Sequence, residues 1–380
     1  MTTSCKQWQF EPLDTWFFRE SRPHGAAGSS RLESIFPPPA RTVAGAIRSL
    51  IGEHGQVDWE KFHDKDKSTE KLRNIIGFAD DLGQLELMGP YLLYEDKRLY
   101  SVPLSLLNKD SEFVRLRPGD PVVCDLGCVR LPETEKKLKG AKPLENTWVT
   151  AEVFKKLLAG ENLSAADELL KKEHLFDVES RVGIAINKEQ RIVEESMLYQ
   201  TQHVRPRSKV KIGVTVSGIT DESMYPDSEV HCRFGGEGRL ATVNIPEVNI
   251  DKLTLSADKL KTGNVLLVLL THADLKGCWL PDQTFVREKC SNYDVWRGKI
   301  NGIELTIMSA ILGKAIREGG WDLAQKKPRA VKSLAPAGSV WFCKLKNRQV
   351  IDVIDKLQGF KIGCDTALGR GEIAVGVWEE

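Results

Sequence analysis

Alternating apolar and polar positions predict several β-strands along the chain. Residues 181–187 and 209–218 carry an apolar side chain at every second position. Because alternate side chains of a strand point to the same face, each segment is expected to bury one face. Residues 264–272 are apolar almost without interruption, which is typical of a central strand buried on both faces. Further strand patterns cover residues 7–18 (with a turn at Pro12), 192–203, 338–345 and 373–377.

Helical spacing of apolar positions predicts a helix over residues 40–51, directly after three consecutive prolines. Proline fixes φ near the helical value and needs no amide partner, so it suits the start of a helix. Gly52 is a natural stop. Arg41 and Arg48 are seven residues apart and therefore share one polar face of this helix, which makes them candidates for binding an anion.

Shorter helices are predicted elsewhere, separated by irregular sequence. Two follow Thr150, and the second is indicated by the capping-box pattern of Ser164 and Asp167. Another is expected at residues 350–357. Residues 55–147 show only short strand signals between polar loops, and we interpret them as insertions.

The two halves of the chain end in a similar way, with a glycine cluster, a basic residue and a strand. These endings lie at residues 235–243 and 368–375. The pattern predicts an α+β fold with two related domains, divided near residue 250. The chain length of 380 residues agrees with about two domains.

The charge pattern favours a local basic surface. A formal net charge of +1 excludes a protein coated in positive charge. Any surface that binds nucleic acid must therefore come from basic residues gathered locally. Basic residues outnumber acids in residues 15–51, 199–211 and 325–337, and the last two segments contain no acid. Each segment alone is more typical of a solvated face, whereas their combination favours an anionic partner.

Composition argues against several other classes of protein. Eight cysteines are scattered along the chain, and Cys124 and Cys128 lack a second pair at matched spacing, so we expect buried thiols and no metal. The longest apolar run, residues 265–270, is too short to span a bilayer, and the N-terminal residues lack a signal-peptide pattern. We expect a cytoplasmic protein with no membrane partner and no cofactor.

Four segments carry a resemblance to a known family. The opening FEPLDTWFFRESRPHG followed by FPPPARTVAGAIRS resembles the start of the third-subunit family of type III-B CRISPR (Cmr) effector complexes, within the RAMP superfamily. RVGIAIN with ESMLYQTQHVRP is similar to its central segment, and SLAPAGSVWF with GCDTALGRGEIAVGVW is similar to its C-terminal part. The matches follow the expected order over almost the whole chain.

The resemblance implies two ferredoxin-like (RRM-like) domains with glycine-rich loops and large insertions. The N-terminal domain would span residues 1–250, with insertions at about 53–180 and a thumb hairpin at about 181–203. The C-terminal domain would span residues 251–380. Such a subunit holds the 5′ tag of the guide RNA (crRNA) without catalysis, and meets target RNA only indirectly through the guide. Its protein partners would be the large polymerase-like scaffold subunit and the adjacent RAMP backbone subunit.

Residue chemistry supplies candidates for RNA contact. Guanidinium groups pair with two phosphate oxygens at once, and glycine loops let backbone amides approach phosphate. Phe36, Tyr199 and Phe234 are possible stacking platforms, although each is more typical of a core. Lys326, Lys327 and Arg329 would suit RNA or a protein neighbour equally. In the last glycine loop, Arg370 replaces the apolar or aromatic residue that is usual between such glycines, which favours a phosphate contact. The RNA-binding candidates are Arg19, Arg22, His24, Arg41, Arg48, Arg205, Arg207, Gly235, Gly236, Gly238, Arg239, Gly369, Arg370 and Gly371.

Three functions other than RNA binding have some support in the sequence. A metal-independent endoribonuclease would use a histidine to move a proton, and His24 and His203 are the candidates. A dinucleotide site is formally suggested by Gly236, Gly238 and Ala241, but the strand-like sequence after them lacks the required helix, so it is rejected. A pure assembly subunit without RNA contact remains open, although the clustered arginines disfavour it.

Overall fold

The computed structural model describes the chain as two compact units, each made of three separate segments. Unit 1 contains Met1–Asp96, Lys172–Asn249 and Arg317–Lys332. Unit 2 contains Lys97–Lys171, Ile250–Ile316 and Ser333–Glu380. The residues described are 5–20, 31–110, 112–136, 138–164, 166–186, 193–247, 253–260, 262–322, 325–346 and 350–380.

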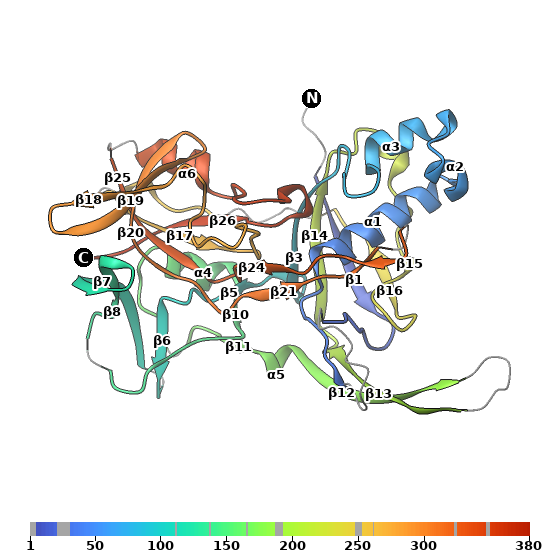
Figure 1. Ribbon diagram of the computed structural model, residues 1–380, viewed down its shortest axis with the longest axis horizontal. Helices are drawn as coiled ribbons and strands as arrows, with labels where there is room; N and C mark the ends of the chain where they lie inside the picture. The colour runs from blue at the N-terminus through green and yellow to red at the C-terminus, as the bar shows by residue number, and fades with distance from the viewer. Residues whose placement is uncertain are drawn as a thin grey trace. The chain divides into compact units, whose positions relative to one another are not determined.

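Unit 1 is built on an antiparallel sheet in the order β15-β16-β1-β14-β3 (Figure 1). Trp8 and Phe10 alternate along the central strand β1, and both are fully buried. The predicted alternation of residues 209–218 is confirmed, because all four apolar side chains of that face are buried in β14. The strands are β1 (Lys6–Pro12), β3 (Glu86–Tyr94), β14 (Val210–Ser217), β15 (Val230–Arg233) and β16 (Leu240–Asn244).

Helix α1 (Ala40–His54) packs its apolar face against this sheet, near β3 and β15. The helix predicted after the prolines is thus confirmed, but the predicted stop at Gly52 is wrong. Gly52 lies inside the helix, where a Cβ would stand 2.6 Å from the Trp59 ring, so the glycine makes room for packing. Unit 1 also contains α2 (Trp59–His63), η1 (Lys67–Thr69), α3 (Glu70–Ile76), α5 (Lys172–Leu175) and η2 (Glu222–Met224).

A long antiparallel hairpin also belongs to unit 1, formed by β12 (Phe176–Ile186) and β13 (Val193–Pro206). Figure 1 shows it in green, extending away from the sheet. Short strand β2 (Arg31–Leu32) pairs with β13 in parallel. Both predicted strands are confirmed, while the predicted turn at residues 188–191 lies outside the described residues.

Unit 2 contains a second antiparallel sheet, in the order β18-β19-β20-β25-β17-β26. Every residue of β17 is buried, as predicted for a strand covered on both faces. Odd-numbered residues of β17 pack with α6 (Val350–Leu357), and even-numbered residues pack with α4 (Ala151–Leu158). The strands are β17 (Asn264–Leu269), β18 (Val286–Cys290), β19 (Tyr293–Ile300), β20 (Ile303–Ile311), β25 (Val340–Leu345) and β26 (Ile373–Val377).

Residues 97–171 form short strands that belong to unit 2 rather than to an insertion of the first half. They contribute Tyr100, Val149 and Phe154 to the core beside α4, which explains why they cluster there. The strands are β4 (Lys97–Arg98), β5 (Tyr100–Ser101), β6 (Leu106–Lys109), β7 (Glu112–Cys124), β8 (Gly127–Thr134), β9 (Lys142–Pro143), β10 (Thr147–Val149) and β11 (Leu170–Lys171). The remaining elements are β21 (Ile316–Glu318), β22 (Trp321–Asp322), β23 (Lys327–Pro328), β24 (Lys332–Leu334), η3 (Ala257–Leu260) and η4 (Thr366–Leu368).

Three expectations about the chain's organisation need correction. The helix predicted from Ser164 and Asp167 does not form: the serine amide does donate to the Asp167 carboxylate at 2.8 Å, but β11 and the four-residue α5 follow. The proposed insertion at residues 53–180 includes β3, which is a strand of the main sheet of unit 1. The predicted boundary near residue 250 coincides with one passage between units, but residues 97–171 and 317–332 fall in the opposite units.

The expected mixture of helices and antiparallel sheet is confirmed. Cys124 pairs with Gly127 and Cys128 with Val123, so the two thiols point to opposite faces of the β7–β8 hairpin and cannot bind one metal together. Within the described ranges, no helix is long and apolar enough to cross a membrane.

Candidate nucleic-acid interface

Three arginines converge on one carboxylate in unit 1. The Asp14 carboxylate lies 2.9 Å from a guanidinium nitrogen of Arg181, 2.8 Å from one of Arg205 and 3.3 Å from one of Arg239. Its side chain is 46% exposed, so the group meets solvent. Hydrogen bonds from Arg181 and then Arg205 lower the pKa of Asp14 to about 2, which keeps the carboxylate ionised at neutral pH.

A second acid, Glu179, completes what we term the arginine cluster: Asp14, Glu179, Arg181, Arg205 and Arg239. Arg205 donates to Glu179 from both Nε and Nη2, and Arg181 lies 3.4 Å from the same carboxylate. Three cations against two carboxylates leave the cluster with an excess of one positive charge. Because all five groups sit near water, their ion pairs exchange at little cost in free energy.

The cluster is assembled from three parts of unit 1. Register pairs Glu179 with His203 and Asp177 with Arg205, which places the charged groups of β12 and β13 on one face of the hairpin. Asp14 follows β1, and Arg239 ends the glycine loop between β15 and β16. The hairpin base, the segment after the central strand β1 and the first glycine loop therefore meet at one place.

His203 lies enclosed beneath this surface. The ring is 1% exposed, its Nδ1 is 3.2 Å from the Thr15 hydroxyl, and it stacks on Phe17 with ring centroids 5.3 Å apart. Burial, with added repulsion from Arg239 and Arg181, lowers the pKa of His203 to about 4, so the ring is neutral at pH 7. An enclosed, neutral ring lacks the access to substrate that a proton-transfer group needs, which disfavours a nuclease centred on His203. His24, the other candidate, lies outside the described residues.

The first glycine loop is fixed to the chain segment that follows β1. The Gly236 amide donates to the Phe17 carbonyl at 2.7 Å. Gly235 has φ +91°, and a Cβ there would stand 2.6 Å from the same carbonyl, so a larger residue would push the loop away. Gly238 has φ +65° with open space around it. The loop thereby holds Arg239 beside Asp14.

The second glycine loop, at residues 369–371, encloses its arginine instead of exposing it. Arg370 is 2% exposed and pairs with Asp365 at 2.9 Å. The Gly371 amide donates to the His272 carbonyl at 3.0 Å, and Gly369 has φ +88°. The expected phosphate contact of Arg370 is not available in this structure, because the guanidinium is enclosed and pairs with the half-buried carboxylate of Asp365.

The two arginines of α1 do share a face, but a loop covers it. Arg41 pairs with Asp80 at 3.1 Å. Arg48 donates to the carbonyls of Ala79 and Gly77 at 3.0 and 3.1 Å, and burial lowers the pKa of its guanidinium. Arg48 therefore anchors this loop.

The other predicted residues are spread over the described chain. Arg19 is exposed, and Arg207 is an exposed partner of Asp177 at 3.0 Å. Arg22 lies outside the described residues. Of the aromatic candidates, Phe234 is fully buried and stacks on Phe10 at 4.6 Å, whereas Phe36 packs on Phe176 at 4.7 Å and Tyr199 is partly exposed.

Sequence reasoning missed three members of the arginine cluster: Asp14, Glu179 and Arg181. A partial signal was present, because Glu179 lies two residues before Arg181, the first residue of the predicted strand, and shares its face if the strand begins earlier. Acids repel phosphate, so the acids that organise the cations were not among the RNA-binding candidates.

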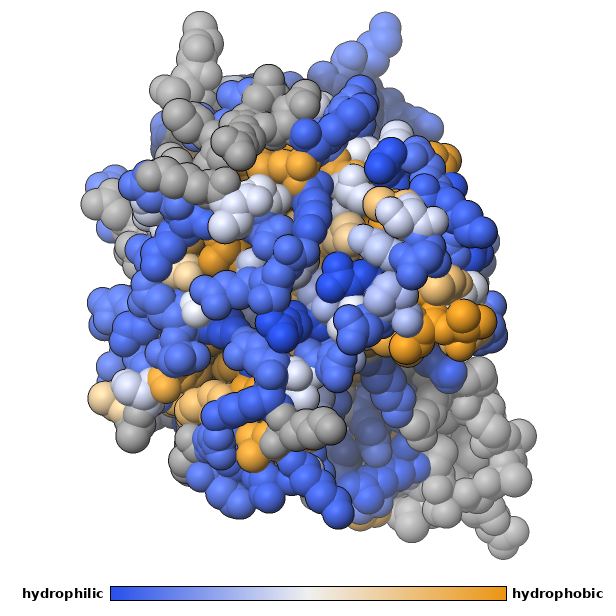
Figure 2. Space-filling model, turned by 90° about the vertical axis from the view of Figure 1, so that its left-hand side faces the viewer, coloured by the Kyte–Doolittle hydropathy of each residue, from blue (hydrophilic) through white to orange (hydrophobic). Residues whose placement is uncertain are grey.

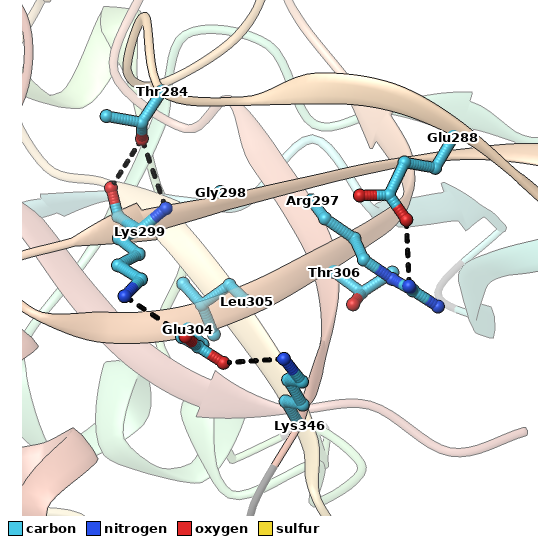
Figure 3. A pocket seen from close by; sticks show the side chains of 9 residues that line it. All are labelled: Thr284, Glu288, Arg297, Gly298, Lys299, Glu304, Leu305, Thr306 and Lys346. Atoms are coloured by element: carbon cyan, nitrogen blue, oxygen red, sulfur yellow. Dashed lines mark hydrogen bonds and ion pairs between the residues drawn. The ribbon is translucent and has the colours of Figure 1, made fainter.

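A cavity of about 410 Å³ lies over the sheet of unit 2 (Figure 3). Its charged side chains pair with one another: Arg297 with Glu288 at 2.8 Å, and both Lys299 and Lys346 with Glu304. One face of the molecule, drawn in Figure 2, is largely hydrophilic with separate apolar patches. Among the residues that the structure describes, no three His, Cys, Asp or Glu side chains are placed to hold a metal ion.

Two antiparallel sheets with flanking helices, together with a solvent-facing cluster of arginines, define an α+β protein with an anion-attracting surface. Residues 8–378 match the family described as "CRISPR-associated protein (Cas_Cmr3)". The chain therefore belongs to the Cas_Cmr3 family, and the resemblance found in the sequence is confirmed.

Solved structures give a weaker likeness. A chain of a type III-B Cmr-beta complex bound to cognate target RNA and AMPPnP shares 14% identity and a TM-score of 0.47, with 92% of this chain and 88% of that chain covered. A chain of a Csm3-Csm4 subcomplex of the type III-A interference complex shares 12% identity and a TM-score of 0.38, with 99% and 100% covered. No curated protein matches the chain.

Proposed function

We propose that this chain is a non-catalytic, guide-RNA-binding subunit of a type III-B CRISPR effector complex. It holds the 5′ tag of the crRNA and bridges the large scaffold subunit to the adjacent RAMP backbone subunit. Membership of the Cas_Cmr3 family supports a place in such a complex. The observation that carries RNA binding is the arginine cluster, where three guanidinium groups converge at a solvent-facing point.

The chemistry of the cluster suits an RNA backbone. A phosphate resembles a carboxylate in presenting two oxygens to a guanidinium fork, so a phosphodiester can take the place that Asp14 now occupies. The excess positive charge attracts an anion before contact is made. Backbone contacts of this kind need no base sequence, which fits a subunit whose guide reads the target by pairing.

The finer description of the fold belongs to the same proposal. Each unit has an antiparallel sheet with a helix packed on it, α1 in unit 1 and α6 in unit 2, as a ferredoxin-like (RRM-like) domain has. The β12–β13 hairpin is the thumb. Target RNA is met indirectly, through the guide.

Co-expression with the neighbouring subunits tests the proposal. The complex should retain short RNAs that share one constant 5′ end, and these should stay uncut when incubated with fresh chain. Changing Arg181 and Arg205 together to alanine should lose most of this RNA and reduce the salt dependence of binding by roughly one to two phosphate contacts.

A matched control is Arg297→Ala, which removes an equally exposed guanidinium that pairs with Glu288 in unit 2. It should leave the retained RNA unchanged. Equal RNA retention in the double variant and wild type would refute the assignment of the cluster. Steady cleavage by the chain alone would show an endoribonuclease instead.

A further inference from the structure

A short hairpin in unit 1 presents a tryptophan to solvent. Strand β22 (Trp321–Asp322) pairs with β23 (Lys327–Pro328), so that Trp321 lies opposite Pro328 and Asp322 opposite Lys327. Trp321 is 57% exposed. It is the one aromatic side chain among the exposed large apolar residues of the described ranges. An exposed indole does not contribute the large hydrophobic free energy that its burial would give, so its exposure needs an explanation.

The hairpin is held firmly from its other face. Arg329 pairs with Asp322 at 2.8 Å and with Asp80 at 2.5 Å, and its amide donates to the Gly320 carbonyl at 2.9 Å. The Asp322 side chain is 13% exposed. Since neighbouring side chains of a strand point in opposite directions, anchoring Asp322 inward turns Trp321 outward. The indole is thus displayed on a fixed support.

The hairpin that carries the indole has an excess of positive charge. Lys326 and Lys327 are both exposed, and residues 325–337 contain no acid. The acid of the hairpin, Asp322, is already matched by Arg329. The centres of protein–protein interfaces are depleted in charged residues, whereas single-stranded nucleic acids are bound by aromatic side chains set among cations. The pattern therefore favours RNA over a protein partner.

We propose that this hairpin is a base-stacking site: an unpaired RNA base stacks on Trp321, and the two exposed lysines of the same hairpin, Lys326 and Lys327, attract the phosphates of that strand. The site lies outside the arginine cluster and shares none of its residues. It rests on the proposed RNA-binding function and extends it, because it adds recognition of an unpaired base to recognition of the backbone. Stacking tolerates any base, since every base has a flat face.

Affinity for single-stranded RNA tests the site in the assembled complex and in the full chain. Fluorescence anisotropy with a labelled, unstructured oligonucleotide should show Trp321→Ala binding about 5- to 100-fold more weakly, the range for loss of one stacked base. Trp321→Phe should stay within about threefold of wild type, because the ring is kept. Trp321→Leu should be as weak as Trp321→Ala, because it keeps apolar contact but no flat ring.

Salt dependence separates the roles of the residues. Trp321→Ala should leave the slope of affinity against salt unchanged, whereas Lys326→Ala with Lys327→Ala should reduce it by roughly one to two contacts. Val331→Ala, which alters a 51% exposed apolar side chain of the same segment, is the control and should have no effect. Thermal unfolding of every variant should match wild type.

The outcomes distinguish this site from the wider function. If the Arg181 and Arg205 double variant loses RNA while Trp321→Ala binds normally, the stacking site is wrong and the proposed function stands. If neither change affects binding, both are wrong. If Trp321→Leu behaves as wild type while Trp321→Ala drops out of the complex, the hairpin is a protein contact, and the inference is overturned.

Discussion

The two glycine-rich loops, at residues 235–239 and 369–371, each carry an arginine and an ion pair. Arg239 has a side chain that is 25% exposed and lies 3.3 Å from Asp14, which itself faces solvent. The side chain of Arg370 is 3% exposed and lies 2.9 Å from Asp365. The same residue types thus serve a surface cluster in unit 1 and an internal contact in unit 2.

The surroundings of each loop explain the difference. The Gly236 amide ties the first loop to the segment that also supplies Asp14, and open space lies around Gly238. In the second loop, Thr271 donates to the Gly369 carbonyl at 2.8 Å, and a Cβ on Gly371 would lie 1.9 Å from the Ile362 carbonyl. Dense packing encloses Arg370, so its charge pairs with Asp365, five residues earlier in the same loop region. A glycine–arginine pattern therefore predicts a loop but does not decide what its arginine binds.

The largest effect is expected from Arg370→Ala, which tests whether Arg370 stabilises unit 2 or binds RNA. Removing this enclosed side chain should lower the free energy of unfolding by about 3 kcal/mol, because both its packing in unit 2 and its ion pair with Asp365 are lost. Chemical denaturation measures the effect, and the folded variant should still retain guide RNA. Normal stability with lost RNA would mean that Arg370 is a ligand residue after all.

Alanine at matched glycines gives the next largest difference. Gly371→Ala should destabilise by about 2–3 kcal/mol, because a left-handed φ of +78° is combined with a backbone clash. Gly238→Ala has a φ of +65° and no atom in the way, so about 1 kcal/mol is expected. Unfolding curves for the pair test this order, and equal costs would contradict the view that Gly371 is packed against backbone while Gly238 lies in open space.

Asp14→Asn sharpens the description of the first loop. It removes the negative charge that the three arginines share, so RNA should bind about 3- to 10-fold more tightly at low salt. Anisotropy titrations of the variant and wild type at two salt concentrations measure the change. Weaker binding would show instead that Asp14 positions the arginines for RNA.

The smallest expected effect is the pH response of His203, the ring beneath the first loop. Its pKa in the folded chain is about 4, below the usual value of 6.5, so the folded state prefers the neutral ring. Its contribution to stability is therefore complete above pH 6.5 and is lost as the pH falls toward 4. NMR titration of the imidazole should give a midpoint near 4, identified by its absence in His203→Gln. A midpoint near 6.5 would mean that the ring is open to solvent and would revive the nuclease hypothesis.

Local patterns predicted the regular elements well, because period and proline position act within a few residues. β14, β17 and α1 follow from alternation, from continuous apolarity and from the prolines. Only residues 91–94 of β3 gave a strand signal, because Gly89 and Pro90 interrupt its pattern, and pairing with β14 outweighs that interruption. The Ser164–Asp167 contact formed without a helix, since such a hydrogen bond stabilises a turn equally well.

The candidate site was predicted only in part. Arg205 was expected from its basic neighbourhood and Arg239 from its glycine loop, and the structure brings them together at Asp14. Arg48 and Arg370 looked equivalent to them in sequence, but Arg48 is partly covered by a loop and Arg370 is enclosed. Enclosure depends on segments distant in the chain, such as residues 77–79 for Arg48, so no local pattern carries it.

The division of each unit into three segments has a consequence for how the protein is made. Unit 1 needs Arg317–Lys332, which the ribosome adds only after most of unit 2. A nascent chain therefore cannot finish its first unit before starting its second, and we expect the two to mature almost together near the end of synthesis. A product released at residue 250 would lack the last segment of unit 1 and would expose Lys97–Lys171 without the sheet on which it packs. Cellular quality control would therefore recognise such fragments as incompletely folded proteins, because they do not contain a complete domain.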